Sequence, residues 1–152
     1  MLLHATAVAR QGLCVLLRGP SGAGKSDLAL RMIATTPSPS LPTGDFALLS
    51  DDQVRLELVA GTLRATAPAS IAGRMEVRGI GIVELPAAAH ARVALIADLV
   101  AADRIERMPE PAEVTLLGVT VPLLAMAPWQ ASAPLKLALA LDLAARRLSG
   151  HS

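Results

Sequence analysis

The stretch GLCVLLRGPSGAGKSDLALRMIA, residues 12–34, decides the fold class of this chain. It begins with an apolar run typical of a β-strand, continues through a glycine-rich loop, and ends with the spacing of an amphipathic helix. The loop, residues 19–26, matches G-x-x-x-x-G-K-[ST] at each fixed position, which is the pattern of a phosphate-binding P-loop. In such a loop, backbone N–H groups and the positive end of the helix converge on phosphate. The stretch therefore predicts an α/β fold with a nucleotide site.

The residue types in the glycine-rich loop have separate predicted roles. The glycines allow the backbone to approach phosphate closely, Lys25 supplies positive charge to the terminal phosphates, and the Ser26 hydroxyl can ligate Mg²⁺. The predicted cofactor-binding residues of the loop are Gly19, Pro20, Ser21, Gly22, Ala23, Gly24, Lys25 and Ser26. The alternative interpretation is an ordinary glycine-rich turn between a strand and a helix, with an exposed lysine.

The rest of the sequence predicts a mixed sheet with flanking helices. Apolar runs indicate strands at residues 2–9, 13–17 and 46–49, a hairpin at 54–67, a strand buried on both faces at 92–100, and two strands after a turn at 108–111. Helical spacing indicates helices at residues 27–34 and 134–148, the second ending at Ser149 and Gly150. Because only one strand-to-helix step is clear, we expect a mixed α/β fold and not a regular doubly wound one.

Two segments interrupt this pattern. Residues 35–44, TTPSPSLPTG, predict a surface loop or insertion, because their prolines cannot continue the preceding helix. Residues 71–86 contain three glycines and alternating charge, and we interpret them as a loop that enters a strand.

Composition excludes several classes of function. With 152 residues, 53% hydrophobic and 18% charged, the chain should fold as a single domain. A net charge of +1 argues against nucleic acid as a partner. The single cysteine excludes an internal disulfide and a multi-cysteine zinc site, which fits a cytoplasmic location. Glycine and prolines interrupt the longest uncharged stretch, residues 114–135, so we expect no membrane span.

Asp51 and Asp52 follow the predicted strand at residues 46–49. Phosphoryl transfer needs a carboxylate for the metal and often a second one that accepts a proton from the attacking hydroxyl. We assign Asp51 to Mg²⁺ and Asp52 to the general base. Adjacent side chains of an extended chain point to opposite sides, so both reach one site only if the chain bends locally. The alternative is that the two residues merely end a strand and begin a turn.

The glycine-rich loop, the paired aspartates and the segment RMEVRGIGIVEL at residues 74–85 together resemble the catalytic domain of the HPr kinase/phosphorylase family. The segment at residues 74–85 is similar to that family's own signature. The resemblance extends from His4 to the C-terminal helix and lacks the family's separate N-terminal domain, so we expect a short form with the catalytic domain only. It implies the α/β fold of the HPr kinase C-terminal domain, with a P-loop similar to that of phosphoenolpyruvate carboxykinase.

The resemblance also implies roles for individual residues. His4 corresponds to the family's active-site histidine and Asp52 to its proton acceptor. Ser26 and Glu76 correspond to Mg²⁺ ligands, and Arg78, in the same signature, is a predicted cofactor-binding residue. Arg104 resembles the catalytic arginine that follows a buried strand, although the intervening loop is shorter here. On residue type alone, His4 would be an ordinary strand histidine and Arg104 a solvated charge.

The implied function is an ATP- and Mg²⁺-dependent kinase of a serine in an HPr-like phosphocarrier protein, in a homohexamer. The family also catalyses the reverse process, in which phosphate attacks phosphoserine. For that process it has a basic loop before the last helix, whereas this chain has APWQASAPLK at residues 127–136, with Lys136 and no arginine. Trp129 and His90 match nothing in the family pattern, and we assign them core or surface roles.

Two alternatives stay open. A small-molecule P-loop kinase would use the same phosphate machinery on a metabolite, although no pair of lid helices is evident. A nucleotide-sensing module would bind ATP and regulate a partner without chemistry.

Overall fold

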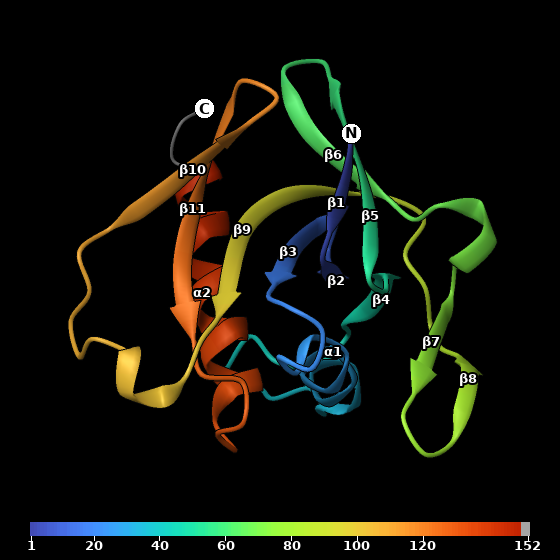
Figure 1. Cartoon of the computed structure of the whole chain (residues 1–152). Coiled ribbons are helices and arrows are strands. Elements are labelled where there is room, and N and C mark those ends of the chain that lie inside the picture. Colours follow the sequence, from blue (N-terminus) through green and yellow to red (C-terminus); the bar gives the residue numbers. More distant parts are fainter. Residues whose placement is uncertain (150–152) are drawn as a thin grey trace.

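The computed structural model describes residues 1–149, in which a curled nine-stranded sheet and a separate hairpin pack with two α-helices (Figure 1). The strands of the large sheet are β1 (Leu2–His4), β2 (Thr6–Arg10), β3 (Leu13–Arg18), β4 (Ala47–Ser50), β5 (Gln53–Val59), β6 (Thr62–Thr66), β9 (Ala91–Leu99), β10 (Ala112–Leu116) and β11 (Val119–Met126). The hairpin consists of β7 (Arg74–Val77) and β8 (Gly81–Glu84). The helices are α1 (Lys25–Ala34) and α2 (Ala133–Ser149), with 3₁₀ turns η1 (Ala69–Ile71) and η2 (Ala102–Arg104).

Strand β9 organises the large sheet. The order is β1-β5-β6-β9-β3-β2-β4, and β11 also pairs with β9 and carries β10 at its other edge. The pairings of β9 with β3 and with β11 are parallel, whereas β6 pairs with it antiparallel. Because β6 pairs with the beginning of β9 and β11 with its end, a single strand joins the two parts of the curled sheet.

Three hairpins turn over two residues that both have positive φ, as a type I′ turn requires. These turns are Gln11-Gly12, Ala60-Gly61 and Leu117-Gly118. A glycine in the second position tolerates this conformation without steric cost. The turns determine the registers of β2 with β3, β5 with β6, and β10 with β11.

Two hydrophobic cores lie on opposite faces of β3. Val15 and Leu17 pack in the core that α1 and α2 cover, while Cys14 and Leu16 pack in the core enclosed by the curled sheet. All four side chains are fully buried. The strand that leads into the glycine-rich loop is therefore held rigidly on both faces.

The structure confirms the predicted mixed α/β class and corrects two details. The run at residues 2–9 forms two strands, because β1 pairs with β5 while β2 pairs with β3 and β4. Residues 71–86 contain the β7–β8 hairpin, because Gly79 and Gly81 adopt positive φ where the chain turns. Gly150, expected at the end of the last helix, lies outside the described residues. Within residues 1–149 no helix is both long and apolar enough to cross a membrane.

Candidate active site

The glycine-rich loop wraps around the N-terminus of α1. Gly22 and Gly24 have φ of 85° and 98°, which L-residues with a side chain rarely adopt. Gly24 caps the helix, and its carbonyl accepts a hydrogen bond from the Leu28 N–H at 2.9 Å. The Ala23 N–H donates to the Pro20 carbonyl at 3.0 Å and closes the turn. The loop thus leads from β3 directly to a helix N-terminus, an arrangement that favours anions.

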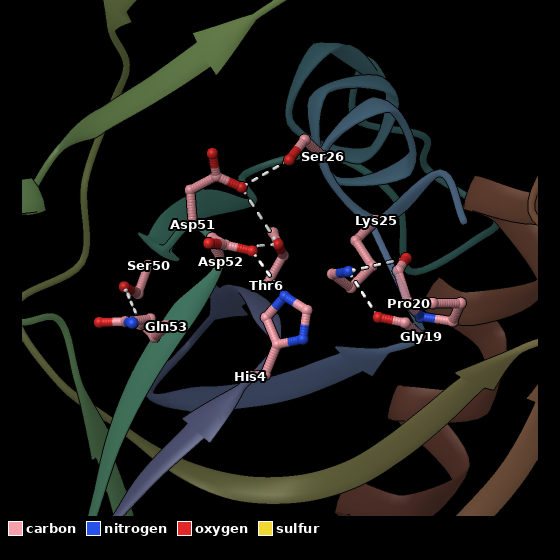
Figure 2. Close-up of polar contacts among 10 residues, drawn as sticks. All are labelled: His4, Thr6, Gly19, Pro20, Lys25, Ser26, Ser50, Asp51, Asp52 and Gln53. Atoms are coloured by element: carbon pink, nitrogen blue, oxygen red, sulfur yellow. Dashed lines mark hydrogen bonds and ion pairs between the residues drawn. The ribbon is translucent and has the colours of Figure 1, made fainter. Parts of the chain in front are cut away.

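Lys25 is buried beneath this loop. Its Nζ donates to the carbonyl oxygens of Gly19 at 2.6 Å and Pro20 at 3.1 Å (Figure 2). The ammonium group therefore lies inside the loop, close to the residue at which the helix begins. A phosphate on the loop would lie within reach of a cation that is already held in position.

Asp51 connects the glycine-rich loop to the sheet. Its Oδ1 accepts hydrogen bonds from the Ser26 hydroxyl at 2.6 Å and from the Thr6 hydroxyl at 3.1 Å. Thr6 is fully buried, and its Oγ1 also accepts the Asp52 N–H at 3.2 Å. The strand β2 thus orients both aspartates through a single hydroxyl. Sequence reasoning missed Thr6, because a threonine in a strand is ordinary and only the β2–β4 pairing brings it beside Asp51.

Asp52 provides the local bend that two adjacent aspartates need. Its φ of 70° turns the chain between β4 and β5, and its carbonyl accepts the Ala5 N–H at 3.2 Å. The carboxylate Oδ1 lies 2.7 Å from His4 Nε2, and the two side chains are 65% and 51% exposed. In Figure 2 the His4 ring points toward the aspartates from the end of β1. The site therefore pairs a solvent-facing carboxylate with an imidazole.

A cavity of about 760 Å³ opens between the glycine-rich loop, the aspartates and the β7–β8 hairpin. This volume is within the ~300–1,000 Å³ typical of small-molecule sites. The predicted site residues that line it are Ser21, Gly22, Gly24, Lys25, Ser26, Asp51, Asp52, Glu76 and Arg78. Glu76 and Arg78 belong to the β7–β8 hairpin. The buried Met75 side chain packs this hairpin into the core beside α1. The structure therefore brings these nine predicted residues together around one cavity.

Some predicted residues lie elsewhere. Gly19, Pro20 and Ala23 belong to the loop but do not line the cavity, and His4 reaches it only through Asp52. Arg104 is exposed at the end of η2 and does not line the cavity. Lys136 donates to the Gln130 side chain at 2.9 Å, in the connection between β11 and α2.

The donor atoms near Asp51 suit a hard divalent cation. Ser26 and Asp51 place a hydroxyl and a carboxylate in contact, and Glu76 lines the same cavity. Mg²⁺ prefers oxygen ligands and takes only one or two from the protein when phosphates supply others. Across residues 1–149 no three His, Cys, Asp or Glu side chains are grouped closely enough to hold a metal by themselves. The residues present fit Mg²⁺ bound together with a phosphate ligand.

Arg18 and Asp98 join the ends of the two central strands. Arg18 Nε and Nη2 donate to the two carboxylate oxygens of Asp98 at 2.7 and 3.1 Å, across the β3–β9 pairing. The hydrogen bond to Asp98 raises the pKa of Arg18 above its ordinary value. This bidentate pair lies directly before the glycine-rich loop and anchors the strand that carries it.

The connection between β11 and α2 packs against the same loop. Arg31 Nε binds Asp27 at 2.8 Å, and its other nitrogens donate to the carbonyl oxygens of Pro128 and Gln130. Between these two carbonyls stands Trp129, whose ring lies against Gly24 and lines the cavity. Its place beside the glycine-rich loop was missed, because nothing in the local sequence relates residue 129 to residue 24.

Comparisons with known proteins agree with this architecture. Residues 1–127 match the family model described as HPr Serine kinase C-terminal domain. A solved structure, the Hpr(Ser) kinase/phosphatase from Coxiella burnetii, superposes with a TM-score of 0.80 and 21% identity over 99% of this chain and 94% of that chain. The HPr kinase/phosphorylases of Clostridium novyi (strain NT) and Clostridium tetani (strain Massachusetts / E88) are 36% and 34% identical over 85 and 84 residues.

The fold is thus that of an HPr kinase/phosphatase, with a curled mixed sheet and two helices. The chain belongs to the HPr kinase C-terminal domain family, as the resemblance predicted. The segments aligned with the two clostridial proteins make up 56% and 55% of this chain and 25% of each relative.

Proposed function

We propose that this chain is an ATP- and Mg²⁺-dependent serine kinase that acts on an HPr-like phosphocarrier protein. One observation carries the proposal. In a chain of this family, hydrogen bonds run from Ser26 through Asp51 and Thr6 to Asp52 and His4, beside the glycine-rich loop. The residues proposed to bind phosphate, to hold the metal and to accept the proton are therefore adjacent.

In this proposal, the glycine-rich loop binds the phosphates of ATP, and Lys25 and Arg78 neutralise charge on the phosphoryl oxygens. Ser26, Asp51 and Glu76 would hold Mg²⁺. When bound, the ion shields the phosphate oxygens and favours attack by a hydroxyl. Arg104 stays a predicted catalytic residue, and it would have to reach the phosphates from η2, outside the cavity lining.

Asp52 is the proposed general base. Its exposed carboxylate accepts the proton of the acceptor serine as the serine oxygen bonds to the γ-phosphorus and the bond from that phosphorus to ADP breaks. His4 holds the carboxylate through the 2.7 Å contact and is the proposed assisting residue. The exposure of both side chains suits an acceptor that is a protein segment arriving from solvent.

The test uses Asp52→Asn with a matched control, Asp45→Asn. Both aspartates are exposed and have positive φ, 70° and 60°, and asparagine tolerates this conformation. The chain is incubated with ATP, Mg²⁺ and an HPr-like carrier, and phosphoserine is measured by mass spectrometry. We expect transfer by the wild type and Asp45→Asn, about 10²- to 10⁴-fold slower transfer by Asp52→Asn, and none after Mg²⁺ is chelated.

Three results would overturn the proposal. Wild-type rates in Asp52→Asn would remove the general base. ATP consumption that needs a metabolite and no carrier would indicate a small-molecule kinase, and ATP binding without any turnover would indicate a sensor. Adding inorganic phosphate to the phosphorylated carrier tests the reverse reaction, for which Lys136 is the only basic residue of residues 127–136.

We also propose that the chain forms an oligomer, a hexamer by family resemblance. Leu135, Leu139 and Leu143 recur every four residues on α2 and are all exposed. Residues four apart share a helix face, so these leucines form one apolar stripe that a second copy can cover.

A further inference from the structure

Trp129 is unusual for this chain in composition and in position. The sequence has one Trp, one Phe and no Tyr, and Phe46 is buried. Trp129 is 66% exposed. A large aromatic side chain that lines a cavity and stays exposed to solvent has apolar surface available for a ligand.

The ring is held beside the predicted phosphate site. A Cβ atom built on Gly24 would lie 2.9 Å from Trp129 Cζ2, so the edge of the ring lies directly on the helix cap. Arg31 binds the carbonyl oxygens on both sides of Trp129, those of Pro128 and Gln130. The backbone of this connection is thereby fastened to α1, and the side chain is presented in a defined place.

The charged residues proposed for the metal and the phosphates, Asp51, Glu76 and Arg78, lie toward the other side of the cavity, while Lys25 and Asp27, which also line it, belong to α1. Asp51 follows β4, and Glu76 and Arg78 belong to the β7–β8 hairpin, whereas Trp129 belongs to the connection that precedes α2. Figure 1 shows α1 between that connection and the hairpin. A nucleotide with its phosphates on the glycine-rich loop would have on one side the carboxylates proposed to hold the metal and to accept the proton. On its other side would lie the aromatic ring of Trp129.

We infer that Trp129 is the base-binding residue of this site and stacks on the purine ring of ATP. The inference rests on the proposed nucleotide site and adds the part that recognises the base. Stacking suits this position because the flat face of a base is bound by an aromatic ring, and Trp129 is the aromatic residue that lines the cavity. Arg31 acts as a positioning residue, since it touches the backbone next to Trp129.

The test compares ATP with inorganic tripolyphosphate, which carries the same phosphate chain and lacks the base. Because Trp129 is the only tryptophan and there is no tyrosine, its fluorescence reports on the site directly. We expect ATP to quench this fluorescence and tripolyphosphate to leave it nearly unchanged. Calorimetry then gives the affinities of the wild type, Trp129→Ala and Trp129→Phe for both ligands.

Trp129→Ala should lower the affinity for ATP roughly 5- to 150-fold, the range for loss of one stacked base. Trp129→Phe should recover most of this affinity. The affinity for tripolyphosphate should not change in either variant. Met108→Ala, which removes an apolar side chain that is exposed outside the cavity, is the control and should leave both affinities unchanged.

The outcomes separate this inference from the proposed function. If Trp129→Ala lowered the affinities for ATP and for tripolyphosphate equally, the ring would only support the loop. If the affinity for ATP did not change, the base would bind elsewhere. Either result overturns the inference and leaves the phosphate site intact. A wild-type protein that binds neither ligand would overturn the nucleotide site and the inference with it.

Discussion

Thr6→Val isolates the hydroxyl that orients both aspartates. Valine keeps the branched shape that a strand favours, so the substitution removes one oxygen and little else. Two hydrogen bonds disappear: the one that Thr6 donates to Asp51 at 3.1 Å and the one that it accepts from the Asp52 N–H at 3.2 Å. Thr6 is completely buried, so no water can take the place of its hydroxyl without displacing packed atoms.

The expected loss of stability follows from these contacts. An unmade hydrogen bond at a buried group costs about 1–3 kcal/mol. Both bonds are longer than 3 Å and their Asp51 and Asp52 partners are only partly buried, so the cost belongs in the lower part of that range. For a chain of this size, 1 kcal/mol lowers Tm by about 2–4 °C, so we expect a decrease of roughly 2–8 °C. Kinase activity should fall about 10- to 100-fold, because small displacements of catalytic groups are costly.

The assay is thermal unfolding together with phosphoserine formation, and Thr43→Val is the matched control. Thr43 is also buried, and its hydroxyl donates to the Thr36 carbonyl at 3.0 Å, away from the cavity. Thr43→Val should lose stability to a similar degree and keep its activity. If Thr6→Val had the stability and activity of the wild type, Thr6 would not orient the aspartates.

Two further predictions concern pH and assembly. Burial raises the pKa of the Cys14 thiol from 9.0 to about 12, so the unfolded chain loses this proton first and the free energy of unfolding should fall between pH 9 and 12. Urea unfolding across that range should show a slope that approaches that of one proton, about 1.4 kcal/mol per pH unit, and Cys14→Ala should lack it. An equal slope in the variant would assign the effect to other groups. Leu139→Glu should reduce the mass measured by light scattering to that of one chain, while Leu117→Glu, with nearly equal exposure of 41% against 42%, should not. A wild-type protein that is already a monomer would contradict the proposed oligomer.

Local patterns in the sequence predict the parts of the site that are close along the chain. The strand, glycine-rich loop and helix at residues 12–34 follow from periodicity and from glycines that the backbone requires at positions 22 and 24. The Ala60-Gly61 turn follows from its neighbouring strands in the same way. Such features depend on contacts between near neighbours, which composition and spacing record directly.

The remaining features depend on contacts between distant residues. Thr6 reaches Asp51 only because β2 pairs with β4, and Trp129 reaches Gly24 only because Arg31 binds the connection before α2. Residues 71–86 were interpreted as a loop that enters a strand, because glycines weaken strand propensity, whereas the positive φ of Gly79 and Gly81 makes the turn of a hairpin. The family resemblance correctly indicated the fold, but it carried no information about Trp129.

The central position of β9 has a consequence for how the molecule folds. Strand β3 finds its hairpin partner β2 at once, but its other edge pairs with residues about eighty positions later, in β9. During synthesis the strand that carries the glycine-rich loop therefore has one open edge until β9 has emerged. Chains dominated by such distant pairings fold slowly, on the order of milliseconds to seconds, and an unpaired edge can bind other chains in the meantime. Because β9 pairs with this edge late, we expect the chain to be most prone to aggregation before β9 has been synthesised.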